Sequence, residues 1–534
     1  MTIIDTDDLQ QAVQLGGHLM SDPISDQSTY IMRKWLERCH NNHPECRIIG
    51  SRPGEEERPT LPTRLIEVGS NGDKEVKISL TYGLFGKFAA LSHRWTAGKT
   101  PNWVTTTSNV KERCKGLDVK DLPKSIQDAI KVTRKLTLQY LWVDSLCILQ
   151  DSAVDWDIES SKMVNVYSEA YITLFADRAR DDEEGFLGPR TFQDNEPLTL
   201  SLRIQPGHDK TLPVLIRTPA MLSYSAHDFN HTVEKSILSE RGWVLQERLM
   251  SRRILHFESE QTCWECRATV DQEDGMVTNG RREWLTGAHN ALKKASSDDN
   301  YWRQVVEAYS RRQLTQHSDK LPALSGIANA ISAVREGDVY LAGLWKNSLL
   351  FDLTWRTERG KWDDGGVKIM KPSDYRAPSW SWASIDGPIE HKYCLENAES
   401  GHVTAAFDIL EGKVVPMGHN PFGQVRHGFL KLSGFLLEAI CLGPITRWDI
   451  PLYHEGTPLG NFHPDTKEDV LVISVTCLKL LDFGSIWDEV FLVLVPAGGA
   501  FKRIGLGDTR IGDGSRYYTE SVFESKAKQL ITLI

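Results

Sequence analysis

The sequence predicts an α/β fold, a parallel sheet with flanking helices, followed by a mixed helical and β-rich C-terminal region. Between Lys87 and Ala176, apolar runs of strand length alternate with segments whose apolar residues recur at helical spacing. Strands separated by helices pair in parallel and are covered on both faces. Beyond Gly401, short β-branched runs and glycine turns replace the helical pattern.

Two features precede the alternating region. We expect one helix around Thr29–Cys39, within an otherwise irregular N-terminal stretch. Apolar and polar residues then alternate in Arg64–Val68 and in Val76–Leu80. Alternation of this kind predicts two short strands that form a hairpin in front of the main sheet.

The alternating region itself contains three predicted strands and two predicted helices. The apolar run Phe88–Ser92 predicts the first strand, and Pro123 suits the first turn of the helix that follows. Tyr140–Ile148 predicts a second strand, and Tyr171–Phe175 a third. The segment Asp155–Ala170 between them has the apolar spacing of a helix.

The remainder of the chain predicts a helical part and then a β-rich part. Tyr301–Tyr309 is a clear amphipathic helix, and we expect Glu524–Leu533 to be a closing helix. A chain of 534 residues is too long for one typical core. The expected domains are an N-terminal helical and irregular region at 1–60, a principal domain with its leading hairpin at 61–260 (core about 85–250), a mainly helical region at 261–400 and a β-rich module at 401–534.

Charge and composition limit the classes of function. The formal net charge of −10 disfavours an extended nucleic-acid-binding face. We find no secretory signal, and no apolar run reaches the roughly twenty residues that span a bilayer. The nine cysteines, an odd number, fit reduced thiols. We therefore expect a cytoplasmic protein without a membrane span and without a nucleic-acid partner.

One carboxylate lies within an apolar helical stripe. If Asp155–Ala170 is a helix, Glu159 shares a face with Trp156, Met163, Val166, Tyr167 and Ala170. Asp157 and Lys162 fall off that stripe and are expected to be solvated. An isolated charge on a buried face is costly, so Glu159 should be paired, desolvated or exposed in a cleft.

Two interpretations of Glu159 remain open from its sequence position. It could pair with an arginine such as Arg94 or Arg241 and serve the core alone. Alternatively, burial and neighbouring charges could raise its pKa and suit it to catalysis. Such a group can stabilise a developing oxocarbenium ion or accept a proton from a hydroxyl or a water.

The loops that leave two predicted strands are the candidate ligand-binding positions. In parallel sheets, ligands bind beyond the carboxyl ends of the strands. That rule points to Ser92–Trp95 and to Asp144–Gln150. No G-x-S-x-G sequence accompanies Ser92, so a hydrolase triad is unsupported, and the chain has no P-loop sequence.

Two groups of cysteines resemble partial metal sites. Cys39, His43 and Cys46 follow C-x3-H-x2-C spacing, but zinc wants a fourth ligand and none is near in sequence. A packed cysteine–histidine turn is the favoured interpretation. Cys263 and Cys266 form a CxxC within a strand-like run, where structural thiols are expected. We therefore assign no metal and no cofactor.

Several sequence blocks follow one another in a specific order. They are Phe88-Ala-Ala-Leu-Ser-His-Arg-Trp95, Leu122-Pro-Lys-Ser-Ile-Gln-Asp-Ala129, Tyr140-Leu-Trp-Val-Asp-Ser-Leu-Cys-Ile-Leu-Gln150, Trp156-x-x-Glu159 with Met163, Tyr167 and Ala170, Arg241-Gly-Trp-Val-Leu-Gln-Glu-Arg248 and Arg253-Ile-Leu-His-Phe257. In content and spacing these blocks resemble the fungal heterokaryon-incompatibility (HET) domain. Flanking similarity extends to Trp35, Cys39, His43 and Cys46 and to Tyr375–Ala383.

The resemblance implies a role in fungal nonself recognition and programmed cell death. Its partners would be other proteins of the incompatibility response or further copies of the chain. HET domains are thought to be distantly similar to TIR domains, which implies a TIR-like or flavodoxin-like sheet. Many TIR domains cleave NAD with a helix glutamate in a Trp-x-x-Glu context. Trp156-Asp-Ile-Glu159 has that form, so by analogy Glu159 is the catalytic candidate and NAD a candidate substrate.

The same analogy assigns substrate-binding positions around the two loops. Trp95 or Trp142 would stack a ring, and Arg94 would contact a phosphate. The expected substrate-binding residues are Ser92, His93, Arg94, Trp95, Trp142, Asp144 and Gln150. Two alternatives to an NAD-cleaving enzyme stay open: a non-enzymatic module that triggers death by assembly, and an accessory regulator of another fungal pathway.

Overall fold

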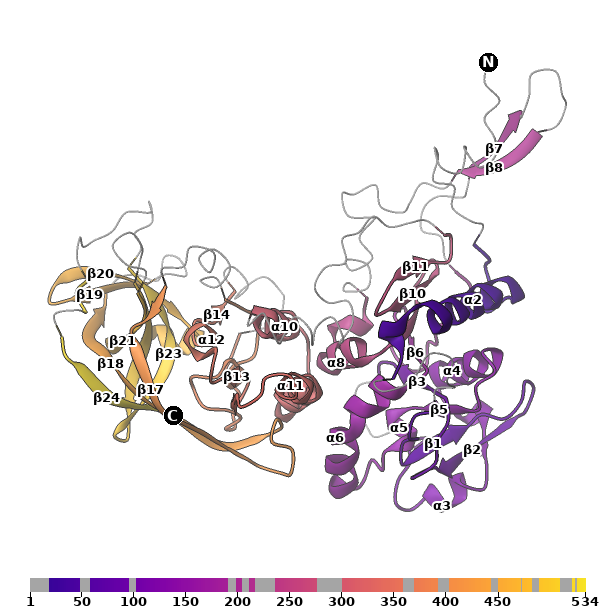
Figure 1. The fold of residues 1–534 in the computed structure, drawn as a ribbon, viewed down its shortest axis with the longest axis horizontal. Helices are drawn as coiled ribbons and strands as arrows, with labels where there is room; N and C mark the ends of the chain where they lie inside the picture. The colour runs from indigo at the N-terminus through magenta and orange to yellow at the C-terminus, as the bar shows by residue number, and fades with distance from the viewer. Residues whose placement is uncertain are drawn as a thin grey trace. The chain divides into compact units, whose positions relative to one another are not determined.

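The computed structural model forms two compact units, Met1–Ala291 and Leu292–Ile534, shown in Figure 1. The structure describes residues 19–48, 58–95, 102–190, 198–203, 211–216, 236–275, 300–358, 369–391, 403–442, 450–471, 473–482, 489–509, 521–523 and 526–534. Parts of the expected N-terminal and central helical regions, residues 1–18 and 276–299 among them, lie outside the described residues.

Unit 1 is built on a nine-stranded sheet of order β11-β10-β9-β6-β3-β5-β1-β2-β4. Its four central strands, β9, β6, β3 and β5, are parallel, and the outer strands pair antiparallel. The expected all-parallel sheet is therefore a mixed one. The strands are β1 Arg64–Glu67, β2 Glu75–Leu80, β3 Phe88–Ser92, β4 Leu117–Asp118, β5 Tyr140–Trp142, β6 Ile172–Phe175, β9 Arg253–Phe257, β10 Thr262–Cys266 and β11 Val270–Gln272. A separate hairpin joins β7 Leu198–Arg203 and β8 Thr211–Ile216.

The burial of the strands explains their order. Every residue of β3, β6 and β9 is buried, as expected for parallel strands covered on both faces. In contrast, β2 begins with an alternation of exposed and buried residues, the pattern of a strand with one face in solvent. The predicted hairpin of β1 and β2 is confirmed, with Ile66 opposite Ile78.

Helices cover both faces of this sheet. The chain runs from β3 through α4 to β5, and then returns past β3 through α6 to β6 and through α8 to β9. Because such crossovers are right-handed, this reversal places α4 on one face and α6 with α8 on the other. Figure 1 shows α6 and α8 side by side, and they pack together. The helices of unit 1 are α2 Asp26–Asn42, α3 Val110–Arg113, α4 Lys124–Lys135, α5 Asp144–Cys147, α6 Ala153–Glu169 and α8 Gly242–Met250.

Two sequence-based assignments are wrong. The expected strand Tyr140–Ile148 ends at Trp142, and Asp144–Cys147 forms the short helix α5. The expected closing helix is instead a strand, β24 Lys528–Leu533, which pairs with β18. In both segments the apolar pattern is compatible with either structure, and tertiary contacts decide between them.

Unit 2 combines short helices with a large antiparallel sheet. Strand β18 pairs with both β19 and β21, so the path β18-β21-β22-β23-β20-β19 closes on itself. The helices are α10 Asn300–Ser310, α11 Ser325–Ser332 and α12 Leu349–Asp352. The strands are β12 Tyr340–Leu341, β13 Leu344–Trp345, β14 Arg356–Thr357, β15 Ile389–Glu390, β16 Thr404–Ala405, β17 Phe407–Pro416, β18 Val425–Cys441, β19 Ile450–His454, β20 Thr457–Pro464, β21 Ser474–Asp482, β22 Val490–Ala497, β23 Ala500–Asp508 and β24.

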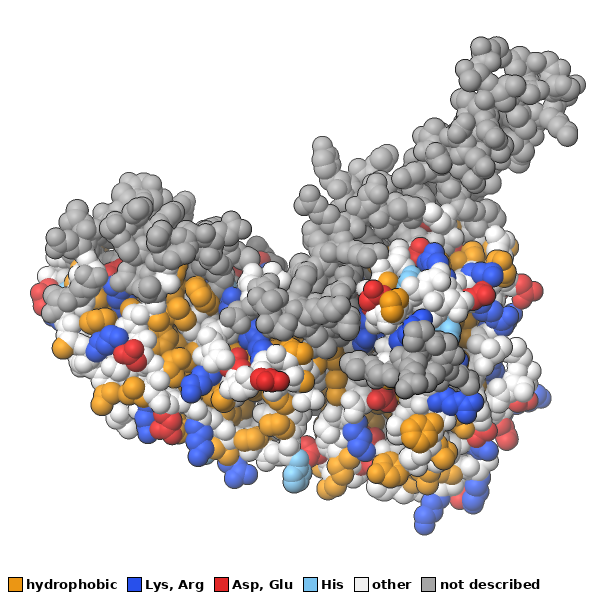
Figure 2. All heavy atoms as spheres, viewed as in Figure 1, with side chains coloured by type: hydrophobic (Ala, Val, Ile, Leu, Met, Phe, Trp, Pro, Cys, Tyr) orange, Lys and Arg blue, Asp and Glu red, His pale blue; other side chains and the backbone are white. Residues whose placement is uncertain are grey.

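Each unit has its own interior. In unit 1 the buried strands β3, β6 and β9 form the centre of the core. In unit 2 the buried side chains include a tryptophan group, Trp302, Trp345, Trp355, Trp380 and Trp382. Figure 2 shows that hydrophobic side chains also reach the surface of both units on the viewed face. Among the described residues, no helix is both long and apolar enough to cross a membrane.

Candidate functional site

The candidate site lies at the carboxyl ends of the central parallel strands in unit 1. The strand order reverses at β3, since α4 leads from it to β5 on one side and α6 returns to β6 on the other. Ligands of α/β sheets bind at such a reversal. Ser92 is the last residue of β3 and His93 follows it, while Asp144 begins the helix after β5.

Asp144 draws the two loops together. Its carboxylate accepts hydrogen bonds from the indole Nε1 of Trp95, at 3.2 Å to each oxygen, and from the backbone N–H of Ser145 at 2.7 Å. Its Oδ1 lies 3.9 Å from Nδ1 of His93. The His93 and Trp95 rings are stacked with centroids 6.4 Å apart. The structure thus brings three of the predicted positions, His93, Trp95 and Asp144, together.

Several buried polar atoms at this edge have no hydrogen-bond partner among the described residues. They are His93 Nε2, Ser145 Oγ and Glu247 Oε2, while Ser92 Oγ makes only a loose contact with the Glu247 carboxyl. Buried polar groups are nearly always paired, so unpaired ones in one neighbourhood need an explanation. A ligand or ordered water that accepts from and donates to these atoms is the simplest one.

Glu247 is the acidic group of this neighbourhood, and it comes from helix α8. Burial raises the pKa of its carboxyl to about 7. The Ser92 hydroxyl, the Arg241 guanidinium and the Tyr167 hydroxyl counteract this increase, and Asp144 adds to it. A carboxyl group with a pKa near neutrality can give or take a proton at physiological pH.

His93 contributes a neutral imidazole. Burial lowers its pKa, and Arg241 lowers it further, although Asp144 and Asp182 oppose the change. Arg241 also donates from Nη1 to the backbone carbonyl of His93. Beneath these groups the Tyr167 hydroxyl donates to the Leu91 carbonyl at 3.3 Å. We define the edge site as Ser92, His93, Asp144, Arg241 and Glu247.

The other expected substrate-binding residues surround or support the edge site. Trp142 is buried, and its ring meets that of Tyr167 edge-on with centroids 5.7 Å apart. The Gln150 amide donates to the carbonyls of Asp144 and Ile148, at 3.1 and 3.0 Å, and braces the loop. Arg94 is partly exposed, and its Nη1 lies 3.5 Å from Glu240 Oε2.

Glu159 lies on α6, where it is buried and paired, so it is not exposed in a cleft. Its Oε1 accepts from the Thr63 hydroxyl at 2.8 Å and from Lys162 Nζ at 2.9 Å. The predicted pairing with Arg94 or Arg241 is wrong, and Lys162 is an ion-pair partner, with its side chain 40% exposed, rather than simply solvated. The preceding turn of α6 is held by Asp155, which pairs with Arg64. A catalytic role for Glu159 stays a prediction.

Sequence reasoning missed Glu247 as a site residue. It stands in the Arg241–Arg248 block, which we used only for the family resemblance. A signal was present, because Glu247 lies between Val244, Leu245, Leu249 and Met250 in a helix that is almost entirely buried. Metal-ligating side chains gather elsewhere in unit 1, where Cys39, His43, Cys46 and Cys266 form one group.

Fold and site together define a mixed α/β domain with a buried polar site at the carboxyl edge of its parallel strands. Residues 88–247 match the family model described as heterokaryon incompatibility protein (HET). The chain therefore carries a HET domain, which begins at β3 and ends at Glu247 and contains every member of the edge site. Neither the curated proteins nor the solved structures gave a match to the chain.

Proposed function

We propose that this chain acts in heterokaryon incompatibility and that its HET domain cleaves the nicotinamide–ribose bond of NAD at the edge site. The observation that carries the proposal is a group of buried, unpaired polar atoms around a carboxyl group whose pKa is about 7. The analogy with NAD-cleaving TIR domains supplies the substrate class, and the family match supports the role in incompatibility.

The proposed reaction uses the edge site as follows. The bond between ribose C1′ and the nicotinamide nitrogen breaks, and its electron pair leaves with nicotinamide. The ribosyl group becomes an oxocarbenium ion, which an ionised carboxylate stabilises. Water then adds to C1′, and its proton passes to a base. Glu247 is suited to both tasks because its pKa of about 7 leaves a large ionised fraction at neutral pH.

Neighbouring groups have supporting roles in this proposal. Nε2 of the neutral His93 ring has no partner among the described residues. It can donate a hydrogen bond in one tautomer and accept one in the other. Trp95 is partly exposed, so its face suits stacking on a ring of the substrate. Arg94, which lies at the rim beside Glu240, suits a phosphate contact.

Glu159 is the second carboxylate to consider for catalysis. The Trp156-Asp-Ile-Glu159 sequence favours it by analogy, whereas its pairing with Lys162 and Thr63 favours a structural role. Two substitutions that preserve shape, Glu159→Gln and Glu247→Gln, separate these assignments.

The test is nicotinamide release from NAD by the purified full-length chain, in dilute and in concentrated or assembled samples. We expect release by the wild type and by Glu169→Gln. Glu169 is a control carboxyl on α6, and burial raises its pKa as it raises that of Glu247. Glu247→Gln should lower the rate at least about 100-fold. If only Glu159→Gln is inactive, Glu159 is the catalytic group. If the wild type is inert in every state, the proposed cleavage is wrong.

A second candidate function is a partner-binding module without chemistry. Large apolar side chains are exposed around the turn between β2 and β3, namely Leu80, Tyr82, Leu84 and Phe85. Apolar patches on a soluble surface often mark interaction sites. Under this alternative the double variant Tyr82→Ser and Phe85→Ser abolishes the cell-death response in a fungal host, and Glu247→Gln leaves it intact. The opposite result would exclude it.

A further inference from the structure

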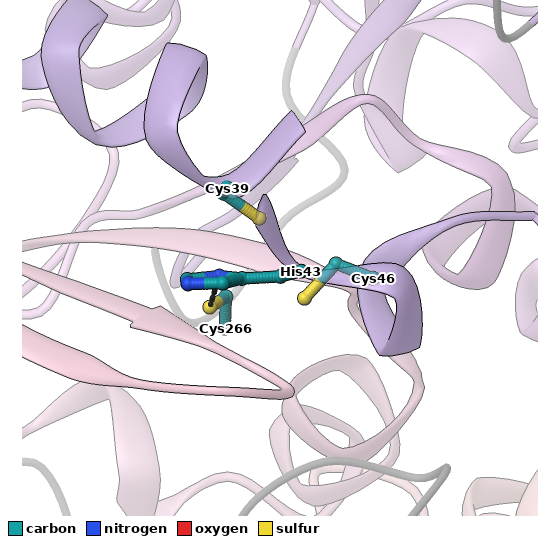
Figure 3. A group of neighbouring side chains, drawn as sticks. All are labelled: Cys39, His43, Cys46 and Cys266. Atoms are coloured by element: carbon teal, nitrogen blue, oxygen red, sulfur yellow. Dashed lines mark hydrogen bonds between the residues drawn. The ribbon is translucent and has the colours of Figure 1, made fainter. Parts of the chain in front are cut away.

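Four side chains that bind soft metals converge on one point in unit 1. Figure 3 shows Cys39, His43, Cys46 and Cys266 with their side chains directed toward one another. Their sulfur and nitrogen atoms all lie within 4.8 Å of one another. Cys266 Sγ lies 3.4 Å from His43 Nδ1.

Local structure brings the first three residues together. Cys39 lies near the end of α2, which His43 caps by donating its backbone N–H to the Cys39 carbonyl at 3.1 Å. Pro44 then starts a short 3-10 turn, Pro44–Cys46, because its ring cannot continue the helix. That turn returns the chain, so Cys46 lies beside Cys39.

The fourth residue comes from a distant segment of the chain. Cys266 ends β10 at a tight hairpin, where its N–H donates to the Thr269 carbonyl at 2.9 Å. The helix α2 and this hairpin are in contact, with the Trp35 and Trp264 rings 6.2 Å apart. Cys263 points to the other face of the strand, as residues three apart do, and packs against Val270. The CxxC is therefore not a pair.

The geometry fits tetrahedral zinc. Zinc–sulfur bonds of about 2.3 Å and zinc–nitrogen bonds of about 2.0–2.1 Å place the ligand atoms roughly 3.5–3.8 Å apart. The ligand atoms lie within 4.8 Å of one another, and Cys266 Sγ lies 3.4 Å from His43 Nδ1, so only a small contraction around an ion is needed. Three thiols and one imidazole are also the ligand set of many structural zinc sites.

The surroundings suit thiolates. The guanidinium Nε of Arg253 donates to Cys39 Sγ at 3.3 Å, and the backbone N–H of Thr269 donates to Cys266 Sγ at 3.4 Å. Hydrogen bonds from outer groups of this kind orient metal ligands and stabilise their charge. Cys39, Cys46 and Cys266 are all buried, and His43 is half-buried. Four protein ligands leave no open position, so the site would be structural.

We propose that Cys39, His43, Cys46 and Cys266 bind one zinc ion that ties α2 to the β10–β11 edge of the HET-bearing sheet. The alternatives explain less. A disulfide would join only two of the three cysteines, and all described cysteines are free thiols. Simple packing of thiols does not explain why three sulfurs and an imidazole nitrogen face one another. These atoms come from positions as far apart in the sequence as 46 and 266.

The test is the zinc content of the full-length chain, purified without a histidine tag under reducing conditions. We expect one zinc ion per chain in the wild type and none in Cys39→Ser or Cys266→Ser. Cys263→Ser is the matched control, since it removes a buried thiol of the same strand outside the group, and it should keep its zinc. An equal loss in Cys263→Ser and Cys266→Ser would overturn the proposal.

A second measurement does not depend on the folding of a variant. Titration of the wild type with a mercurial should release zinc as the thiols react. Replacement of zinc by Co²⁺ should give the absorption bands of a tetrahedral thiolate complex. A wild type that contains no zinc and takes up neither ion would overturn the proposal. So would mass spectrometry that finds a disulfide between any two of Cys39, Cys46 and Cys266.

Discussion

Glu247 combines full burial with an oxygen that has no partner among the described residues, so its protonation should be linked to stability. In the unfolded chain a glutamate loses its proton near pH 4.5, whereas in the fold it keeps the proton to about pH 7. Between these values the folded state binds more protons than the unfolded state. Stability contributed by this group therefore decreases as pH rises from about 4.5 to about 7 and stays low above that.

This linkage gives the first prediction. Glu247→Gln cannot ionise, so it should become more stable relative to the wild type as the pH rises through that window. The change is about 3 kcal/mol in unfolding free energy, measured by denaturant unfolding at several pH values between 4.5 and 8. A constant difference between the two proteins across this range would contradict the raised pKa.

His256 on β9 titrates with the opposite sign. Burial alone would lower its pKa, but Asp177 at 2.8 Å and Glu265 at 3.0 Å outweigh that effect and raise it to about 9. A raised histidine pKa stabilises the fold fully below its unfolded value of 6.5, and the contribution is lost as the pH rises through about 9.

The second prediction follows from this network. The wild type should lose about 3 kcal/mol of unfolding free energy from this group between pH 6.5 and 9. His256→Gln should be less stable at pH 6 and should lack that part of the decrease. The same pH series of denaturant unfolding measures it. If both proteins change in parallel, His256 is not protonated in the fold.

At the residue scale, the sequence predicted the position of the edge site but not its acid. Ser92, His93, Trp95 and Asp144 could be grouped because the carboxyl ends of parallel strands meet at one edge. Glu247 comes from α8, far along the chain, and its approach depends on how that helix packs. Cys266 was not recognised as a fourth metal ligand for the same reason, because C-x3-H-x2-C spacing does not predict a ligand from a distant segment.

At the element scale, prediction succeeded where burial is complete and failed where a segment's apolar pattern is ambiguous. Strand β3 matches its predicted range Phe88–Ser92, and all five of its residues are buried. The run after Trp142 continues with Val143, Leu146 and Ile148, yet Asp144–Cys147 forms a short helix there. The segment Lys528–Leu533 is a strand because β18 offers an edge for it, which no local pattern reveals.

Helix α4 holds the segment after β6 through Ser125, which donates to the carbonyls of Asp181 and Asp182, and through the buried carboxylate of Asp128. Asp128 accepts the backbone N–H groups of Phe186 and Leu187, both at 3.0 Å, and pairs with Lys124 at 2.7 Å. Gly185 sits beside it at φ +73°, where a Cβ would lie 2.6 Å from the Asp128 carboxylate. The approach of this segment to the helix therefore requires a residue without a side chain.

The third prediction tests that connection. Asp128→Ala leaves two amide groups without their acceptor and should lower the unfolding free energy by about 3 kcal/mol. The matched control is Glu112→Ala, which removes an exposed ion pair with Lys115 and should change it by less than about 0.5 kcal/mol. Denaturant unfolding measures both. Similar effects of the two substitutions would mean that Asp128 does not hold the segment.

At the scale of the whole molecule, the chain divides into two units with separate interiors. Unit 1 contains the HET domain, the edge site and the proposed zinc ligands, whereas the closed sheet and the tryptophan group belong to unit 2. The zinc ligands join residues 39–46 to residue 266 and so close a long loop within unit 1. A zinc ion that binds only the folded state stabilises that state relative to the unfolded chain.

The last prediction is that zinc removal affects one unit selectively. Calorimetry of the full-length chain should resolve two unfolding transitions, and chelation of zinc should lower the temperature of one while the other stays fixed. Cys266→Ser should move the same transition without chelator. Leu506→Ala leaves a cavity beside β23 in unit 2 and should lower only the transition temperature of that unit. The expected loss of unfolding free energy is about 2–5 kcal/mol. A single transition that every change moves as a whole would show that the two units unfold together, and an unmoved pair of transitions after zinc release would show that the ion does not support the fold.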